Sequence, residues 1–437
     1  MRIINGPAAR EKRVSCDGVK SGVPRWECPK PTGGCIYTAN MKKLRVGVLF
    51  GGRSGEHEVS LLSAASVLNA IDKKKYEVVP IGITREGRWL TPSHAERLLK
   101  GDKSPEHEPR HLRAGDPEAT SAAAVLAKGE GVVVPPIPGE NHSALVPFET
   151  SAHEVHAAAS PIDVDVIFPV LHGTFGEDGT IQGLLELADI PYVGAGVLGS
   201  ATGMDKDVMK KLFRDAGLPI VKHVTVLRSA WRAEPKKVTK QIESALKYPV
   251  FVKPANLGSS VGINKVHGRG ELPVAMDEAG RFDRKIVIER GVGGAKSKAR
   301  EIECSVLGND HPTASIPGEI VPIKEFYDYD AKYLDEGSEL IIPAKLPKTK
   351  QKEVQQLAIR AFQAVDCAGL ARVDFLMDPR TRKIFVNEIN TMPGFTSISM
   401  YPKLWAASGI EYPELIDRLI QLGLERHAEK KQNRYSR

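Results

Sequence analysis

The segment ARVDF at positions 371–375, followed by VNEIN at positions 386–390, decides the fold near the C-terminal end of this chain. Each segment reads as a short apolar strand that carries acidic or amide oxygens. The 14 residues from Asp374 to Glu388 suit two strands joined by a turn at the sequence DPR, positions 378–380. Because residues two apart on a strand point to one face, Glu388 and Asn390 share a face, and Arg372 shares one with Asp374.

The oxygens of Asp374, Glu388 and Asn390 form a set of hard ligands, of the kind that Mg²⁺ takes together with nucleotide phosphates. Arg372 beside such a carboxylate indicates charge stabilisation in phosphoryl or acyl transfer. An ordinary hairpin with solvated charges is the alternative interpretation. The two segments alone do not decide between these readings.

Length and composition bound the class of protein. The 437 residues exceed one compact core and predict two or three domains. Hydrophobic content of 41% and charged content of 26% are typical of a globular protein. No apolar run approaches the roughly 20 residues that span a bilayer, so no membrane partner is expected.

The formal charge of +7 is concentrated at the N-terminus, where residues 1–40 hold seven Lys or Arg and three Asp or Glu. The remaining chain therefore carries only +3. It has no basic stripe interleaved with aromatic residues, so nucleic acid is not expected as a partner.

The first 40 residues differ from the rest of the chain. They hold Cys16, Cys28 and Cys35, whose spacing matches no standard zinc pattern, and only Cys304 and Cys367 follow. The body therefore resembles a reduced, cytosolic protein. Because Met41 looks like a natural start leading into a strand, we expect residues 1–40 to be a disordered extension without catalytic duty.

The next part reads as a βαβ start, with strands at residues 46–50 and 76–83 and a helix at 58–71 between them. Its glycine turn, GGRSG at 51–55, does not match GxGxxG, so a dinucleotide site is weakly supported. Residues 101–160 are irregular, and their five histidines lack metal spacing. We interpret them as a surface insertion with room for one short hairpin.

A strong strand at residues 163–171 ends in the glycine-rich loop HGTFGEDG, positions 172–179, and a helix opens at Thr180. His172 at the carboxyl edge of a parallel strand is a site candidate. Further on, we expect helices at 203–215 and 233–246 and strands at 221–227, 249–254, 286–289 and 301–307.

Two loops stand out among these elements. Residues 255–262, ANLGSSVG, can fold over phosphates with their backbone N–H groups, although the chain lacks GxxxxGK[ST]. Residues 322–343 show little helical or strand periodicity and carry four aromatics within FYDYDAKY, positions 326–333. A loop near 20 residues within a compact domain is uncommon unless it is functional.

Seven segments, in order, carry a resemblance to one family. They are GGRSGEHEVS (51–60), HGTFGEDGTIQG (172–183), MDK (204–206), VFVKPANLGSSVG (250–262), FYDYDAKY (326–333), ARVDF (371–375) and VNEINTMPGFTSISMYP (386–402). Together they resemble the D-alanine–D-alanine ligases of the ATP-grasp superfamily, over residues 41 to about 425.

The resemblance implies a mixed α/β and α+β fold. It implies a three-domain ATP-grasp ligase with an N-terminal parallel-sheet domain and with ATP between two antiparallel sheets. We expect an N-terminal substrate domain at 41–202 with the insertion 101–160, a central ATP-grasp domain at 203–290, and a C-terminal catalytic domain at 291–437 that includes a lid loop at 322–343.

The implied reaction is the ATP-dependent ligation of two D-alanines to D-alanyl-D-alanine through a D-alanyl phosphate, for peptidoglycan precursors. The resemblance further implies Mg²⁺ or Mn²⁺, two ions in number, a homodimer and a cytoplasmic location. A D-alanine–D-lactate or related ATP-grasp ligase is the alternative. A Rossmann-type dehydrogenase and a nucleotide-binding regulatory protein without activity are less favoured.

The resemblance also assigns residues to ATP and metal. The pattern places the divalent metal on Asp374, Glu388 and Asn390, and phosphate on Lys206 and Lys253. It places Glu289 and Glu301 near adenine and ribose, and the backbone at Gly291 and Val292 against the base. Ser260 and Arg290 belong to the same implied ATP-binding set.

The remaining matches concern the two amino acids. Arg372 and the N–H of Gly394 match the groups that stabilise the oxyanion. Ser399 and the backbone of Met400 match the groups that bind the carboxylate of the second D-alanine. Glu56 matches the residue that binds the ammonium group of the first D-alanine, and His172 lies nearby in the family pattern. A further set, Ser259, Tyr333 and Glu56, matches a triad that fastens the lid, and Lys332 can reach phosphate or carboxylate. A tyrosine at position 333 resembles the alanine-specific type.

Overall fold

The structure is a computed structural model that describes residues 42–91, 130–136, 143–150, 155–157, 161–258, 260–293, 297–322, 338–396 and 398–435. Residues 1–40, most of the lid loop, and the predicted site residues Ser259, Lys332 and Tyr333 lie outside the described residues. Among the helices that it describes, none is long and apolar enough to cross a membrane.

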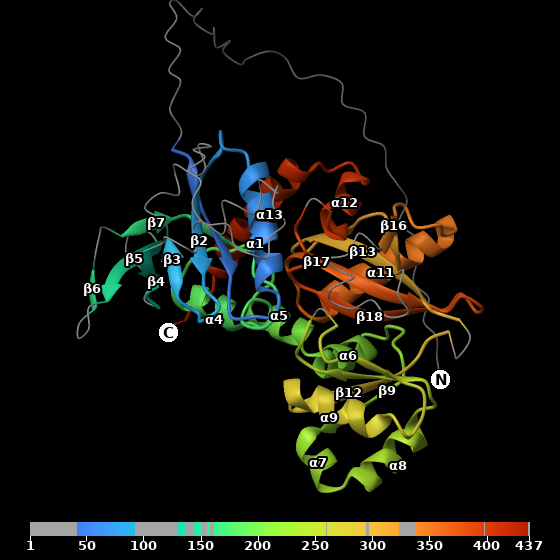
Figure 1. Cartoon of the computed structure of the whole chain (residues 1–437). Coiled ribbons are helices and arrows are strands. Elements are labelled where there is room, and N and C mark those ends of the chain that lie inside the picture. Colours follow the sequence, from blue (N-terminus) through green and yellow to red (C-terminus); the bar gives the residue numbers. More distant parts are fainter. Residues whose placement is uncertain are drawn as a thin grey trace, which may run out of the picture. The chain divides into compact units, whose positions relative to one another are not determined.

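The first sheet is mixed rather than wholly parallel, with the strand order β6-β5-β4-β3-β2-β1-β8 (Figure 1). The buried strand β1 (Leu44–Gly51) pairs in parallel with β2 (Tyr76–Ile83) and β8 (Val166–Pro169). Its apolar run, buried from Val46 onward, is what a strand covered on both faces requires. The remaining pairs are antiparallel and involve β3 (Trp89–Thr91), β4 (Glu130–Val133), β5 (Ser143–Thr150), β6 (Val155–Ala157) and β7 (Ile162–Val164).

Two expectations for this sheet are wrong. The segment 163–171 is not one strand, because β7 pairs with β5 whereas β8 pairs with β1. Asp165 marks the division, since its carboxylate accepts the Arg45 N–H at 2.6 Å. The expectation that residues 101–160 are irregular is also wrong for residues 130–133, 143–150 and 155–157, because β4, β5 and β6 extend the sheet. Only the pairing of β3 with β4, Thr91 with Glu130, spans a long stretch of chain, whereas β5 pairs with its sequence neighbours β4, β6 and β7. The many Pro, Gly and Ala residues of this part of the chain disfavour strands by propensity, so pairing rather than local pattern defines them.

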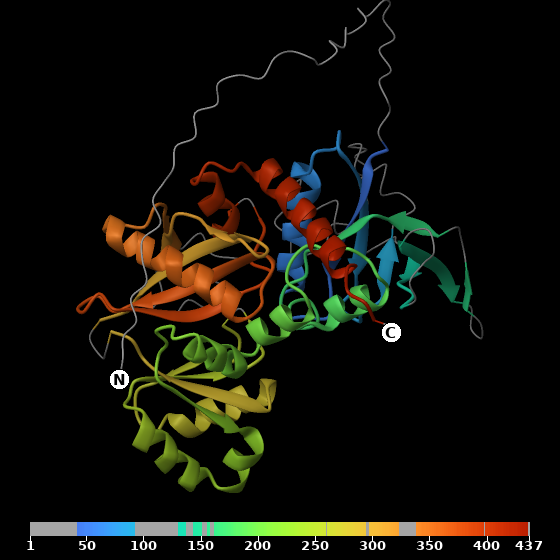
Figure 2. The ribbon, with the colours of Figure 1, turned by 180° about the vertical axis from the view of Figure 1, so that it is seen from behind.

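Helix α1 (His57–Ala70) contacts β1, and α4 (Thr180–Leu187) follows the loop that begins at His172. The C-terminal helix α13 (Tyr412–Lys430) contacts α1 and β8 and shares one hydrophobic core with them. Figure 2 shows this helix, in red, beside the blue N-terminal elements. Helix α13 therefore stabilises α1 and β8 through this shared core.

The second sheet is antiparallel, in the order β11-β10-β12-β9. Its strands are β9 (His223–Leu227), β10 (Val250–Pro254), β11 (Asn264–Val266) and β12 (Lys285–Arg290). They share one core with helices α7 (Arg228–Ala233), α8 (Pro235–Ala245) and α9 (Leu272–Phe282). Helices α5 (Val197–Met204) and α6 (Lys206–Asp215) precede this sheet, and Asp205 between them caps α6.

The third sheet is also antiparallel, in the order β16-β15-β13-β17-β18, with β14 (Thr313–Ala314) on β13. Its other strands are β13 (Arg300–Gly308), β15 (Gly318–Pro322), β16 (Ser338–Ile341), β17 (Gly369–Met377) and β18 (Ile384–Asn390). Helices α11 (Lys348–Ala364) and α12 (Met400–Ala406) contact β13. β16 lies within the segment 322–343, so the expectation that this whole segment lacks strand structure is wrong for residues 338–341.

Candidate active site

The two strands quoted at the outset form the predicted hairpin. Asp374 pairs directly with Glu388 across β17 and β18, and Arg372 pairs with Asn390. A register shift after Asp374 leaves Asn387 as the extra residue, so Glu388 and Asn390 keep a common face. The turn is held by Asp378, whose carboxylate accepts the N–H groups of Arg380 and Thr381 at 2.9 and 3.0 Å.

The oxygens on this face meet the Arg372 guanidinium. Two parallel hydrogen bonds of 2.7 and 2.8 Å join it to the Asp374 carboxylate, and the Asn390 amide donates to the same carboxylate at 2.9 Å. Asp374 is therefore the centre of the cluster. Its bidentate pairing with Arg372 fixes the guanidinium plane, which a single ammonium group would not do.

The donor chemistry of this cluster fits a hard divalent cation. Among the described residues, no group of three or more His, Cys, Asp or Glu is placed to hold a metal. Two carboxylates and an amide suit Mg²⁺, because that ion usually takes one or two carboxylates and completes its shell with water and phosphate oxygens. Asp374, Glu388 and Asn390 would hold such an ion.

Glu303 is a neighbour that the sequence reading missed. It pairs with Asp374 in the register of β13 and β17, is 6% exposed, and lies 3.0 Å from Arg372 Nε. Alternation along β13 could have predicted Glu303 as a site residue, because Glu303 lies on the same face of that strand as the predicted site residue Glu301. Arg372 thus lies between two carboxylates.

The two predicted phosphate lysines lie near the hairpin. Lys206 donates to the Leu257 carbonyl at 2.9 Å and lies 3.4 Å from Glu388. Lys253, on β10, donates to the Glu289 carboxylate at 2.9 Å, and both side chains are buried. The carboxylate of Glu289 thus faces lysines, whereas the sequence prediction places it near adenine and ribose.

A third lysine, Lys210, was not predicted. It is fully buried, lies 2.9 Å from Glu289 and donates to the Asn387 carbonyl at 3.0 Å. Burial lowers the pKa of Lys210. For Glu289, burial opposes ionisation, but Lys210 and Lys253 hold its pKa well below the ordinary value. This Lys–Glu–Lys cluster joins the central sheet to β18 and leaves one excess positive charge beside the predicted phosphate site.

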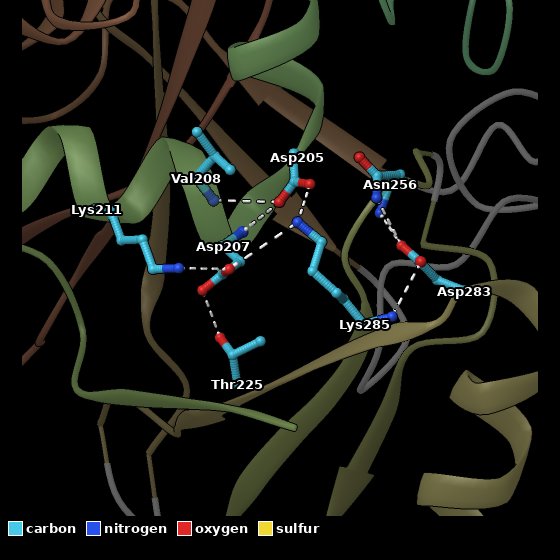
Figure 3. A network of polar contacts seen from close by, with 8 residues as sticks. All are labelled: Asp205, Asp207, Val208, Lys211, Thr225, Asn256, Asp283 and Lys285. Atoms are coloured by element: carbon cyan, nitrogen blue, oxygen red, sulfur yellow. Dashed lines mark hydrogen bonds and ion pairs between the residues drawn. The ribbon is translucent and has the colours of Figure 1, made fainter. Parts of the chain in front are cut away.

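A polar network fixes the start of α6 (Figure 3). This helix carries Lys206 and Lys210. The Asp205 carboxylate caps the helix by accepting the N–H groups of Asp207 and Val208, both at 3.1 Å. Lys285, from β12, forms an ion pair with Asp205. A cap of this kind is worth about 1 kcal/mol.

The same network continues to the glycine–serine loop. Asp283 accepts hydrogen bonds from the backbone and the side-chain amide of Asn256, each at 2.8 Å, and also from the Lys285 N–H at 3.0 Å. The base of loop 255–262 and the start of α6 are therefore held to the same strand. Both elements carry residues predicted to bind phosphate.

A cavity of about 540 Å³ brings most of the predicted residues together. Those that line it are Glu56, His172, Lys206, Ser260, Arg372, Glu388, Asn390, Gly394, Ser399 and Met400. Among the predicted site residues that the structure describes, six do not line it. They are Asp374, which is hydrogen-bonded to Arg372, and Lys253, Glu289, Arg290, Val292 and Glu301, which belong to β10, β12, the segment after β12, or β13.

Glu56 reaches the cavity from the first residue before α1 and is 8% exposed. A Cβ atom added to Gly173 would lie 2.5 Å from the Glu56 carboxylate, and one added to Gly258 would lie 3.0 Å from it. Gly173 also has a φ of +75°, which favours glycine. Two glycine-rich loops from distant parts of the sequence therefore close on this carboxylate.

His172 and Glu177 lie on the same loop. Burial lowers the pKa of His172. Burial, and then the nearby Glu56 carboxylate, raise the pKa of Glu177 to about 8. Glu177 lines the cavity, and the sequence reading missed it although it lies within the quoted HGTFGEDG segment. A carboxyl group with such a pKa is a sign of a functional site.

The loop after β18 carries Gly394. Among the described residues, none accepts a hydrogen bond from the Gly394 N–H, which leaves that donor for a ligand. The Ser399 hydroxyl lies 2.7 Å from the Thr396 hydroxyl and accepts the Thr396 N–H at 3.0 Å. Ser399 is thus held within its own turn, next to Gly394, at the start of α12.

Comparison with known proteins gives a consistent result. Residues 45–195 match the family model described as D-ala D-ala ligase N-terminus, and residues 212–421 match the model described as D-ala D-ala ligase C-terminus. A D-alanine–D-alanine ligase of Heliobacterium modesticaldum is 48% identical over 393 residues, which cover 90% of this chain and 98% of that protein. One of Thermoanaerobacter sp. strain X514 is 50% identical over 391 residues, 89% of this chain and 99% of that protein.

Solved structures agree. The D-alanine–D-alanine ligase of Coxiella burnetii superposes with a TM-score of 0.71 at 37% identity and covers 89% of this chain and 96% of its own. The VanG D-Ala:D-Ser ligase of Enterococcus faecalis superposes with a TM-score of 0.72 at 34% identity, over 87% and 100%.

Proposed function

The chain belongs to the D-alanine–D-alanine ligase family, and from this premise we propose that it joins two molecules of D-alanine at the expense of ATP. The product is D-alanyl-D-alanine, a precursor of peptidoglycan. One observation carries the proposal. A single cavity is lined by Lys206, Glu388 and Asn390, which suit phosphate and metal, and by Glu56, which suits an ammonium group.

The first step activates a carboxylate, which is a poor acylating agent by itself. A carboxylate oxygen of the first D-alanine attacks the γ-phosphorus of ATP, the bond to the bridging oxygen breaks, and D-alanyl phosphate and ADP form. Lys206 holds phosphate oxygens at the cavity, and the positive excess of the Lys210–Glu289–Lys253 cluster offsets their charge. A divalent ion, when bound by Asp374, Glu388 and Asn390, neutralises phosphate charge.

The second step forms the peptide bond. The free amine of the second D-alanine attacks the acyl carbon, and the carbonyl oxygen becomes an oxyanion. Phosphate leaves as the carbonyl reforms, and it takes up the proton that the amine nitrogen loses. Arg372, fixed by Asp374 and Glu303, and the N–H of Gly394 stabilise this oxyanion. Ser399 and the Met400 N–H, at the start of α12, hold the carboxylate of the second D-alanine.

The predicted lid contributes Lys332 and Tyr333, which lie outside the described residues. Glu56 lies beside Gly258, which precedes Ser259, and this placement supports the triad of Glu56, Ser259 and Tyr333. A closed lid excludes water, which would otherwise hydrolyse the acyl phosphate. Tyr333 also favours D-alanine over D-lactate as the second substrate.

Several further features belong to this proposal. The ion is Mg²⁺ or Mn²⁺, with two ions per site, and the protein works as a homodimer in the cytoplasm. The adenine lies near residues 289–292 and Glu301, with Ser260 over the phosphates. The domains are 41–202, 203–290 and 291–437, and residues 1–40 are an extension without catalytic duty.

A phosphate-release assay tests the function. Release should require ATP and D-alanine together, stop when EDTA removes the divalent metal, and resume when Mg²⁺ is restored. D-Lactate competing with D-alanine at neutral pH separates the two ligase types. Phosphate release without D-alanine, or mainly depsipeptide product, would contradict the proposal.

A further inference from the structure

The loop that carries Gly394 has no regular secondary structure, yet its backbone groups are held on both sides. The Met392 carbonyl lies 3.0 Å from His172 Nδ1, and the Met392 N–H points to the Glu177 carboxylate at 3.4 Å. The Phe395 N–H donates to the Ser63 hydroxyl at 3.2 Å. The Phe395 carbonyl accepts from Tyr412 at 2.5 Å. The residues on each side of Pro393-Gly394 are therefore fixed by other elements.

Ser63 and His172 form one chain of hydrogen bonds within this set. A carbonyl can only accept, so His172 must carry its proton on Nδ1 to bond Met392. In the neutral ring Nε2 is then an acceptor, and it lies 3.0 Å from the Ser63 hydroxyl. Ser63 therefore donates to His172 and accepts from Phe395. Each donor and acceptor in the chain has one consistent role.

Burial supports the assignment. Ser63 is 0% exposed and His172 is 3% exposed, so water does not replace a lost partner easily. The His172 pKa is lowered by burial, which favours the neutral ring that this arrangement needs. The charged groups that act on His172 are Glu56 and Arg372, and the Glu177 carboxyl group accepts the N–H of Gly173, the residue next to His172, at 2.8 Å.

We propose that Ser63, acting through His172 and Phe395, is a positioning residue that fixes the loop at residues 392–395 so that the Gly394 N–H points at the developing oxyanion. This inference rests on the proposed function. Ser63 lies on α1, far along the chain from Gly394, and is not among the described residues that line the cavity, although its hydroxyl contacts the predicted site residue His172. It acts through the loop backbone.

The test compares three variants of the full chain. Ser63→Ala removes the hydroxyl, Ser63→Thr keeps one, and Ser60→Ala is the matched control. Ser60 is a buried serine on the same helix, but its hydroxyl bonds to the Gly51 N–H and the Val170 carbonyl instead of the loop. The measurements are kcat, KM for ATP, the pH profile of kcat and the melting temperature.

We expect Ser63→Ala to lower kcat about 10-fold, less than the roughly 100- to 1,000-fold cost of losing an oxyanion donor outright. KM for ATP should stay near the wild-type value. The acid limb of the kcat profile should move to higher pH, because loss of the hydroxyl donor makes the neutral imidazole less stable. Ser63→Thr should restore kcat, and Ser60→Ala should change stability only.

A wild-type kcat and pH profile in Ser63→Ala would overturn the inference, as would an equal loss of kcat in Ser60→Ala. Nitrogen-15 NMR of the imidazole gives a readout that needs no activity. It should show His172 protonated on Nδ1, and a proton on Nε2 alone would overturn the assignment. D-Alanine-dependent phosphate release by the wild type tests the proposed function separately.

Discussion

Glu289→Gln should strongly destabilise the protein, because it leaves two buried lysines without their anion. Lys210 and Lys253 each lie 2.9 Å from a different oxygen of Glu289, which is 2% exposed, and Lys210 is fully buried. Breaking a buried pair by removing one partner costs about 3–5 kcal/mol. That is a large part of a total stability of roughly 5–15 kcal/mol.

The loss should depend on pH in a defined direction. Without Glu289, the pKa of Lys210 should fall further than burial already lowers it. A lysine whose folded-state pKa lies below its unfolded value binds fewer protons in the folded state. The free energy of unfolding then rises with pH between the two values, so Glu289→Gln should recover stability from neutral to alkaline pH relative to the wild type.

Urea unfolding followed by tryptophan fluorescence measures both effects, since Trp231 is buried in the same domain. The double variant Lys210→Met with Glu289→Gln is the control, because it removes the most buried charge together with its partner. It should recover much of the lost free energy. A free energy of unfolding for Glu289→Gln that lies within about 1 kcal/mol of the wild-type value at both neutral and alkaline pH would contradict this prediction. A difference of that size is usual for an exposed ion pair.

Three further perturbations follow from the site. Arg372→Lys keeps the charge but loses the two-bond fork to Asp374, so kcat should fall about 100-fold, as judged by phosphate release, with little change in melting temperature. Asp205→Ala removes the cap beside Lys206, so stability should fall by about 1 kcal/mol and KM for ATP should rise. Unchanged ATP binding would show that the cap does not position the lysine. Glu177 has a folded-state pKa raised to about 8, so the wild type should lose stability as pH rises from its unfolded value to 8. Glu177→Gln should keep its stability over that range, as measured by urea unfolding at pH 5 and pH 9. An equal loss of stability in the wild type and in Glu177→Gln would contradict this prediction.

The hairpin of β17 and β18 was predictable because its signals are local. Strand alternation places Glu388 and Asn390 on one face of their strand, and a short turn connects that strand to the one that carries Asp374. The register of β17 and β18 confirms that arrangement. By contrast, residues 130–133, 143–150 and 155–157 look irregular in sequence, yet they form strands that pair with β3, with β7 and with one another. Their stability comes from partners that local propensity does not register.

The sequence by itself determined the family, the three sheets' main strands and the residue types of the site. Only the tertiary structure decided that Lys210, Glu303, Glu177 and Ser63 belong with them. Lys210 does follow the buried face of α6, three residues before Phe213 and four after Lys206, and that spacing was its one sequence signal. The physical reason is that a charged side chain is normally solvated, and only packing between elements far apart in sequence removes it from water and supplies its partner.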